Sequence, residues 1–138
     1  ISNKIPTTKQ NNLNEGKKIV LLVDDDPLII RMYQRKLSQD GYEVMLASNG
    51  EEAIARVTKA KPDIILLDLM MPKMNGVQTL KMLKKKSDTK GIPVIILTNL
   101  GDRPKDMEKA KQLGALEYLV KSNISLKDLT KIIKKVIS

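Results

Sequence analysis

The stretch KIVLLVDDDP, residues 18–27, places three consecutive aspartates directly after an apolar run. Residues 18–23 have the length and composition of a buried β-strand. Two carboxylates about 4 Å apart repel each other by roughly 4 kcal/mol at an effective dielectric near 20, so a fold that clusters them needs solvent or a bound cation. We therefore expect a buried strand that ends at a cation-attracting site.

Four more apolar runs follow at residues 43–47, 63–67, 93–98 and 116–120, and each is predicted to form a strand. The segments after the five runs space their apolar residues three or four apart, which is typical of helices. The predicted helices run from Pro27 to the residue before Asp40, from about Asn49 to Ala60, from Gly76 to Lys86, from Pro104 to Leu113, and onward after Ser125. This alternation predicts an α/β fold, a (βα)5 doubly wound parallel five-stranded sheet with helices on both faces.

The first predicted helix shows which side chains are expected to be buried. It carries Ile29, Met32, Tyr33 and Leu37 on one face, and we expect that face to pack on the sheet. Asp26 precedes this helix, and we assign it to the helix start, as a cap or as charge that complements the helix dipole.

Length and composition limit the kind of protein. A chain of 138 residues with 41% hydrophobic residues fits one domain with a buried core. The sequence has no apolar stretch near the ~18 residues that a membrane helix needs and no secretory signal, which favours a cytoplasmic protein without membrane insertion. The lack of cysteine excludes disulfides and thiolate metal sites. The lack of histidine leaves hard, oxygen-bound ions such as Mg²⁺ as the expected metals.

The formal net charge is +9, which favours attraction to nucleic acid or acidic lipid. The densest clusters, Lys84–Lys86 and Lys134–Lys135, lie on predicted helices with an apolar opposite face, so we interpret them as solvated lysine faces. The aromatic residues are three tyrosines, too few for a platform that stacks single strands. Nucleic-acid binding by this domain alone is therefore not expected, although steep salt dependence of polyanion binding would support it.

Residues able to carry chemistry gather at the carboxyl ends of the predicted strands, where sheets of this type bind ligands. Asp24 and Asp25 follow the first strand, Asp68 follows the third, Thr98 ends the fourth and Lys121 follows the fifth. If the strand order is 2-1-3-4-5, Asp68 is central and Lys121 lies two strands away, roughly 10 Å. A lysine side chain can cover much of that distance.

This set of residues points to phosphoryl transfer onto a carboxylate. Asp68 is the candidate nucleophile, because a carboxylate needs no proton removed before it attacks. A cation held by Asp25 and Asp68, with help from Asp24, would screen the acids and bind phosphoryl oxygens. Thr98 and Lys121 would take up charge on the equatorial oxygens. Each residue alone is more often a turn former or a cap, so the joint placement carries the hypothesis.

Several segments together resemble the receiver domain of two-component response regulators. They are residues 19–27 (IVLLVDDDP), 62–72 (PDIILLDLMMP), 75–76 (NG), 93–98 (PVIILT), 114–115 (GA) and 118–121 (YLVK). The resemblance covers residues 17–138 and implies a flavodoxin-like strand order 2-1-3-4-5. It implies that Asp68 accepts a phosphoryl group from the phosphohistidine of a sensor histidine kinase or phosphotransfer protein. The implied Mg²⁺ ligands are Asp24, Asp25, Asp68 and the backbone carbonyl of Met70.

The resemblance also implies a switch. After phosphorylation, Thr98 would turn toward the phosphoryl group and Tyr118 would turn inward, which changes the face made by the fourth helix, the fifth strand and the fifth helix. We expect a downstream effector, an output domain or a second copy to dock on this face, through Tyr118, Lys105, Lys109 and the exposed side of the fifth helix. The chain would accept a phosphoryl group on itself rather than turn over an external substrate, and without histidine it cannot be the donor.

Two positions depart from the family pattern. Ser122 follows Lys121 where proline is usual, which makes a cis peptide at that bond less expected. Asn99 follows Thr98 where a smaller residue is usual, and we expect it to narrow access to Asp68.

Alternatives and domain limits remain open. A phosphatase of the haloacid dehalogenase type would use Asp24 and Asp26. A pseudo-receiver would bind proteins or polyanions without being phosphorylated, and a basic nucleic-acid binder is the third alternative. Residues 1–16 are polar and lack periodicity, so we expect a flexible leader or an expression remnant before a domain at 17–138. That domain either acts alone or comes from a larger regulator or hybrid kinase.

Overall fold

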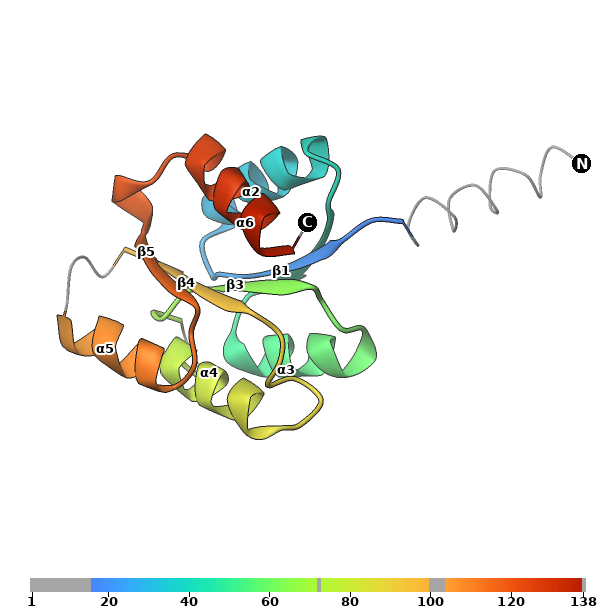
Figure 1. The fold of residues 1–138 in the computed structure, drawn as a ribbon. Coiled ribbons are helices and arrows are strands. Elements are labelled where there is room, and N and C mark those ends of the chain that lie inside the picture. Colours follow the sequence, from blue (N-terminus) through green and yellow to red (C-terminus); the bar gives the residue numbers. More distant parts are fainter. Residues whose placement is uncertain (1–15, 72, 100–103, 138) are drawn as a thin grey trace, which may run out of the picture.

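The computed structural model describes residues 16–71, 73–99 and 104–137. A parallel sheet with strand order β2-β1-β3-β4-β5 forms its centre, and helices cover both faces (Figure 1). The strands are β1 Ile19–Val23, β2 Glu43–Ala47, β3 Ile64–Leu67, β4 Val94–Thr98 and β5 Glu117–Val120. The helices are α2 Pro27–Gln39, α3 Gly50–Lys59, α4 Gly76–Lys85, α5 Pro104–Gln112 and α6 Leu126–Ile137, with a 3₁₀ turn η1 at Lys121–Asn123. The predicted α/β fold and its 2-1-3-4-5 order are confirmed.

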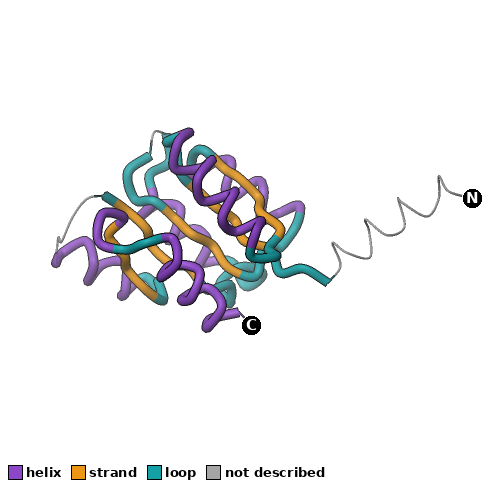
Figure 2. Tube along the Cα trace, turned by 90° about the horizontal axis from the view of Figure 1, so that it is seen from above, coloured by secondary structure: helices purple, strands orange, loops and turns teal. Residues whose placement is uncertain are grey.

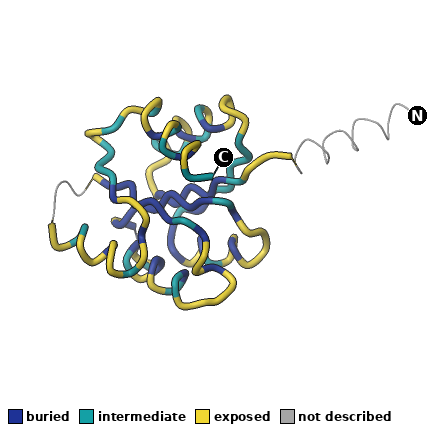
Figure 3. The backbone as a smooth tube through the Cα atoms, in the orientation of Figure 1, coloured by how far each residue is buried: buried dark blue, intermediate teal, exposed yellow. Residues whose placement is uncertain are grey.

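The central strands supply two separate apolar layers. Helices α2 and α6 lie on one face of the sheet, and α3, α4 and α5 lie on the other (Figure 1, Figure 2). Leu21 and Ile65 belong to the cluster packed under α3–α5, whereas their neighbours Leu22 and Leu66 belong to the cluster under α2 and α6. Figure 3 shows these buried strands between helices whose outer surfaces are exposed. Because both faces are covered, β1 and β3 are apolar along almost their whole length.

The helix starts follow from local side chains. The Asp26 carboxylate accepts the N–H of Leu28 at 3.0 Å, so of the two roles expected for Asp26 the structure shows the cap. At α4, Asn75 accepts the N–H of Gln78 at 2.9 Å, and the Gln78 side chain accepts the N–H of Asn75 at 3.2 Å. This reciprocal box satisfies two backbone donors that a helix start otherwise leaves without partners. It anchors the helix that follows the Asp68 loop.

The prediction that Met32 is buried is wrong. Its side chain is 49% exposed, while Tyr33 and Leu37 are buried under α2. Consecutive helix residues point about 100° apart, so the face that presses Tyr33 and Leu37 onto the sheet carries Met32 to its flank.

The interpretation of the Lys84–Lys86 cluster as a solvated face holds for Lys85 and Lys86, which are exposed, and fails for Lys84. The Lys84 ammonium donates to the carbonyl oxygens of Lys90 at 3.0 Å and Ile92 at 2.9 Å. Partial burial lowers the pKa of Lys84. This lysine therefore ties the end of α4 to the segment that leads into β4.

Smaller differences concern boundaries. Four of the five strands begin one residue later than predicted, which is the usual uncertainty of an element end. Apart from Gly16, the expected leader at residues 1–16 lies outside the described residues. Among the described residues, every helix is too short or too polar to cross a membrane.

Candidate functional site

The side chains that the sequence singles out come from four points along the carboxyl edge of the sheet. Asp24 and Asp25 follow β1, and Asp68 follows β3. Thr98 is the last residue of β4, and Lys121 opens η1 directly after β5. The structure thus brings all five predicted positions to one edge.

Backbone pairing sets Asp24 beside Asp68. Val23 lies opposite Leu67 in the register of β1 and β3, and the N–H of Asp68 donates to the carbonyl of Val23 at 3.0 Å. Adjacent strands lie about 4.8 Å apart. The two carboxylates consequently leave neighbouring strands at the same level.

Three carboxylates form one cluster. The cluster consists of Asp24, Asp25 and Asp68. One carboxylate oxygen from each of them lies within 4.8 Å of one carboxylate oxygen from each of the other two. Asp24 is 2% exposed and Asp68 is 6% exposed, whereas Asp25 faces solvent. Burial raises the pKa of Asp24, although the hydrogen bond from Lys121 opposes that rise. An all-oxygen set of carboxylates of this kind suits a hard divalent ion.

Lys121 reaches the centre of the cluster, as its position two strands away predicts. Its ammonium lies 3.2 Å from Oδ2 of Asp68 and also pairs with Oδ2 of Asp24. Burial alone would lower the pKa of Lys121, but its hydrogen bonds and charge interactions with Asp24 and Asp68 outweigh burial and raise it. The lysine therefore stays protonated beside both acids.

Backbone donors hold the other oxygen of each buried acid. Oδ1 of Asp24 accepts the N–H of Asp26 at 2.9 Å, and Oδ1 of Asp68 accepts the N–H of Met70 at 3.1 Å. Each carboxylate is thus held between a backbone donor and the Lys121 ammonium. This arrangement limits rotation of the side chains that would have to align with a ligand.

Gly76 keeps the loop after β3 close to α4. Its N–H donates to the Leu69 carbonyl at 3.1 Å. A Cβ on Gly76 would lie 2.3 Å from the carbonyl oxygen of Asp68 and 2.4 Å from Cα of Leu69. The sequence offered Asn75 and Gly76 as part of a family pattern, and the structure supplies the steric reason for glycine at this point.

The two predicted switch residues lie deep in the fold. Thr98 is completely buried at the end of β4. Tyr118 is also buried, in the apolar cluster beneath α3–α5, so it is already inward in this structure and offers little surface to the partner that was expected to dock through it. The segment 100–103 between β4 and α5 lies outside the described residues.

The mouth of the site is open and partly apolar. Asp25, Leu69, Met70, Met71 and Asn75 line a hollow beside the acids. The side chain of Met70 is 61% exposed. A partner that approaches Asp68 from this side therefore meets apolar as well as acidic surface.

Tyr33 is a neighbour of the site that the sequence assigned to the core alone. Burial raises the pKa of Tyr33, and the charges of Lys121 and Asp24 act on it in opposite directions. The helix period does place Tyr33 on the inward face of α2, but its proximity to this charged pair depends on how α2 packs. No local pattern could have revealed it.

The structure places the two residues that depart from the family pattern, Ser122 and Asn99, close to the site. Ser122 lies within η1, no cis peptide bond occurs in the described part of the chain, and Lys121 still reaches the acids. Asn99 is exposed just beyond Thr98.

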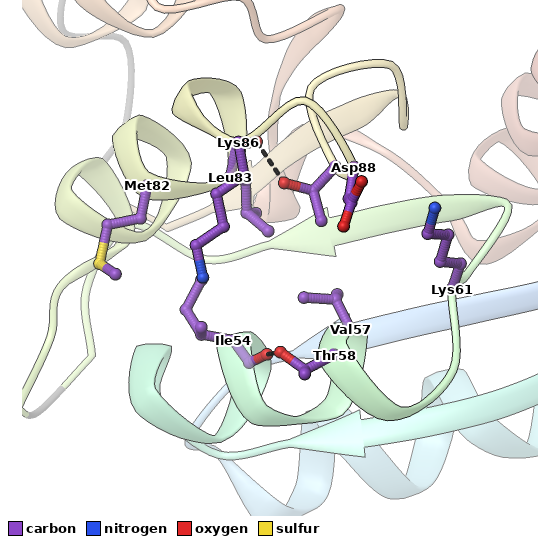
Figure 4. Close-up of a pocket in the computed structure, with 9 residues that line it drawn as sticks. Ile54, Val57, Thr58, Lys61, Met82, Leu83, Lys86 and Asp88 are labelled. Atoms are coloured by element: carbon purple, nitrogen blue, oxygen red, sulfur yellow. Dashed lines mark hydrogen bonds between the residues drawn. The ribbon is translucent and has the colours of Figure 1, made fainter.

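A second hollow lies between α3 and α4, near the amino ends of the strands (Figure 4). Its apolar residues include Ile54, Val57 and Leu83, and Lys61 and Asp88 stand at its sides (Figure 4). Lys61 precedes β3 and Asp88 precedes β4, so this hollow lies at the amino ends of the strands, remote from the acid cluster.

Comparison with known proteins agrees with this arrangement. Residues 20–134 match the family described as response regulator receiver domain. The chain belongs to this family. The assignment, together with the capping role of Asp26, leaves the phosphatase hypothesis built on Asp24 and Asp26 without support.

Relatives of this receiver domain include the probable transcriptional regulator ycf27 of Cyanophora paradoxa, 43% identical over 77% of the chain and 43% of the relative. The chain therefore spans less than half of that relative's length. Among solved structures, Vibrio cholerae chemotaxis protein CheY4 is 35% identical with a TM-score of 0.81, over 88% of this chain and 99% of that one. The Mn²⁺-bound form of response regulator Rcp1 is 32% identical with a TM-score of 0.74, over 86% and 91% of the two chains.

Proposed function

We propose that this receiver domain accepts a phosphoryl group on Asp68 from a phosphohistidine of a sensor histidine kinase or phosphotransfer protein. One observation carries the proposal: Asp24, Asp25 and Lys121 all converge on the Asp68 carboxylate at the carboxyl edge of the sheet. The chain is then a phosphoacceptor rather than an enzyme that turns over an external substrate. We place this exchange in the cytoplasm.

The donor set fits Mg²⁺. The candidate ligands are the carboxylates of Asp24, Asp25 and Asp68, which lie within 4.8 Å of one another, and the backbone carbonyl of Met70. Bound there, Mg²⁺ supplies positive charge to the acids and to incoming phosphoryl oxygens. The Mn²⁺-bound form of Rcp1 shows that a similar receiver takes a divalent ion.

The transfer needs one nucleophile and no base. An Asp68 carboxylate oxygen attacks phosphorus, the new O–P bond forms, and the N–P bond to the donor histidine breaks. The histidine nitrogen keeps the electron pair of the broken bond, and with its other ring nitrogen protonated the donor leaves as neutral imidazole. The Lys121 ammonium, which already donates to Asp68, then donates to a phosphoryl oxygen as negative charge develops there. The Thr98 hydroxyl donates to another phosphoryl oxygen.

We further propose that the phosphorylated site switches the face formed by α5, β5 and α6 through Thr98 and Tyr118. Lys105 and Lys109 of α5 are exposed at this face. A downstream effector, an output domain or a second copy in a homodimer would dock there. The chain covers less than half of its transcriptional-regulator relative, so an output domain in the same polypeptide is one form of this partner.

Mass spectrometry tests the acceptor assignment. Wild type incubated with Mg²⁺ and acetyl phosphate should gain the mass of one phosphoryl group, and Asp68→Asn should gain none. Asp26→Asn is the matched control, since asparagine also caps helices and the residue contacts Asp24 through its backbone alone. Phosphorylation of Asp68→Asn would refute the assignment, and an unmodified wild type would favour the pseudo-receiver alternative.

A further inference from the structure

The two helices on one face of the sheet are rich in basic residues and poor in acids. Helix α2 carries Arg31, Arg35 and Lys36 and no acidic residue. Helix α6 carries four lysines and Asp128 as its single acid. The two helices pack against the same face of the sheet, next to each other (Figure 1, Figure 2). We name their outer surface the α2–α6 face.

A groove runs between these helices. Lys36, Asp40 and Tyr42 at the end of α2 line a hollow together with Thr130, Lys131 and Lys134 of α6. A second hollow is lined by Arg31, Met32, Arg35, Lys36 and Gln39 of α2 and by Leu126 at the start of α6. Lys36 lines both hollows, so they adjoin. Asp40, the acid among these residues, pairs with Lys36 at 3.4 Å.

Three lysines of α6 form a row, and two of them, Lys131 and Lys134, line the groove. Lys127, Lys131 and Lys134 are spaced four and three residues apart, which puts them on one side of the helix. A 13-residue helix such as α2 is about 20 Å long. Duplex nucleic acid presents one negative charge per ~1.7 Å of its axis, so a duplex offers phosphates along the whole groove.

The opposite face is less favourable for an anion. Helix α4 also has three lysines and no acid, but Lys84 already donates to two backbone carbonyls. The helices on either side of α4 carry two acids each, interspersed with basic residues, so this face presents both signs of charge instead of an unbroken basic surface. These acids are Glu51 and Glu52 of α3 and Asp106 and Glu108 of α5.

We propose that the α2–α6 face binds the phosphate backbone of duplex nucleic acid without reading its sequence. Charge complementarity selects a polyanion. A single strand would need aromatic stacking, but Tyr33 and Tyr118 are buried in the core and Tyr42 is half-buried. A membrane surface would need a band of apolar side chains, and the residues of the groove are mostly basic or polar. The proposal does not depend on phosphorylation of Asp68.

Two triple variants with the same change of charge test the proposal. Lys127→Gln, Lys131→Gln and Lys134→Gln remove the row on α6, and Lys81→Gln, Lys85→Gln and Lys86→Gln remove three exposed lysines at α4. Binding of a fluorescent duplex of about 20 base pairs is followed by anisotropy between about 50 and 200 mM KCl. The α6 variant should make the negative slope of log K against log salt shallower by about 2.7, since each lost phosphate contact removes about 0.9 from its magnitude. The α4 variant should keep the wild-type slope.

Several results would overturn the proposal. Equal losses in the two triple variants would show attraction to net charge alone. Tighter binding of phosphatidylglycerol vesicles or polyglutamate than of the duplex would assign the face to a membrane or an acidic protein. No binding of the duplex by wild type at about 50 mM KCl would also refute it. If the α6 variant unfolds by circular dichroism, Arg31→Gln with Arg35→Gln replaces it, with an expected fall in slope of about 1.8.

Discussion

At the scale of single residues, the acid cluster combines three carboxylates with the ammonium of Lys121. Asp24 and Asp68 are buried beside each other, and Lys121 is the cation that contacts both. Burial raises the pKa of Asp24 even with that ammonium in place. Because three carboxylates surround one ammonium, a further cation would be stabilised at this point, as the proposed phosphoryl transfer requires.

Gly76 gives a prediction at the same scale. Gly76→Ala should lower the free energy of unfolding by about 1–3 kcal/mol, because the new methyl group would overlap the backbone of Asp68 and Leu69. The displaced loop should also slow phosphorylation of Asp68. Urea denaturation and the mass assay measure the two effects.

Gly91→Ala is the control for this substitution, since a Cβ at Gly91 meets nothing within 4 Å. Its stability and phosphorylation should stay close to those of wild type. If Gly76→Ala also kept wild-type stability and phosphorylation, the close approach of α4 to the Asp68 loop would be shown to affect neither property.

At the scale of elements, side chains tie helix ends to the loops beside them. Asn75 and Gln78 close the start of α4, and Lys84 closes its end by donating to the carbonyls of Lys90 and Ile92. Thr89 adds a buried hydroxyl that donates to the Leu83 carbonyl at 2.6 Å. These contacts fix α4 at both ends, so the Asp68 loop meets a rigid helix.

Lys84→Met should lower the free energy of unfolding by about 1–2 kcal/mol at pH 7, because two carbonyls lose a donor. Burial lowers the pKa of Lys84, so the folded state also carries a penalty for the charged ammonium, which is fully present below the lowered pKa and is relieved as pH rises to the ordinary value of about 10.4. The stability difference between wild type and Lys84→Met should therefore grow from pH 7 to about pH 11.

Denaturant titrations at several pH values measure this difference. Lys85→Met, at the exposed neighbouring position, should show a small difference that does not change with pH. A pH-independent difference for Lys84→Met would mean that burial of its ammonium has no energetic consequence.

At the scale of the whole molecule, the sheet combines residues that are distant in sequence into one site. Lys121 and Asp24 are separated by 97 positions and form an ion pair. The strand order makes this possible, because β3 and β4 lie between β1 and β5. A divalent ion that binds the folded site and not the unfolded chain should therefore stabilise the entire domain.

Magnesium should raise the thermal midpoint of wild type, with a stabilisation of about 2.7 kcal/mol at 100 times the dissociation constant. Asp25→Asn should reduce this increase, because it removes one of the three clustered carboxylates. Asp26→Asn should retain it, since Asp26 caps α2. Equal midpoint shifts in Asp25→Asn and wild type, measured by calorimetry, would contradict a role for Asp25 in binding the ion.

The same scales show how far prediction from sequence could go. Strands followed from short continuous apolar runs, helices from a period of about 3.6 residues, and the cap at Asp26 from its position before Pro27. The acids and Lys121 were predicted at the correct edge because strand ends are visible in an apolar pattern. Met32 and Lys84 were misjudged, because the exposure of a helix flank depends on the neighbouring elements.

The sequence by itself determined the alternation of elements, their caps and the acids at the strand ends, since these depend on interactions between residues a few positions apart. Tertiary structure decided that the Lys121 ammonium rests between Asp24 and Asp68, that Gly76 touches the Asp68 backbone, and that α2 and α6 share one basic face. These features depend on distances between segments far apart in the chain, and such distances are set by packing of the sheet and helices as a whole.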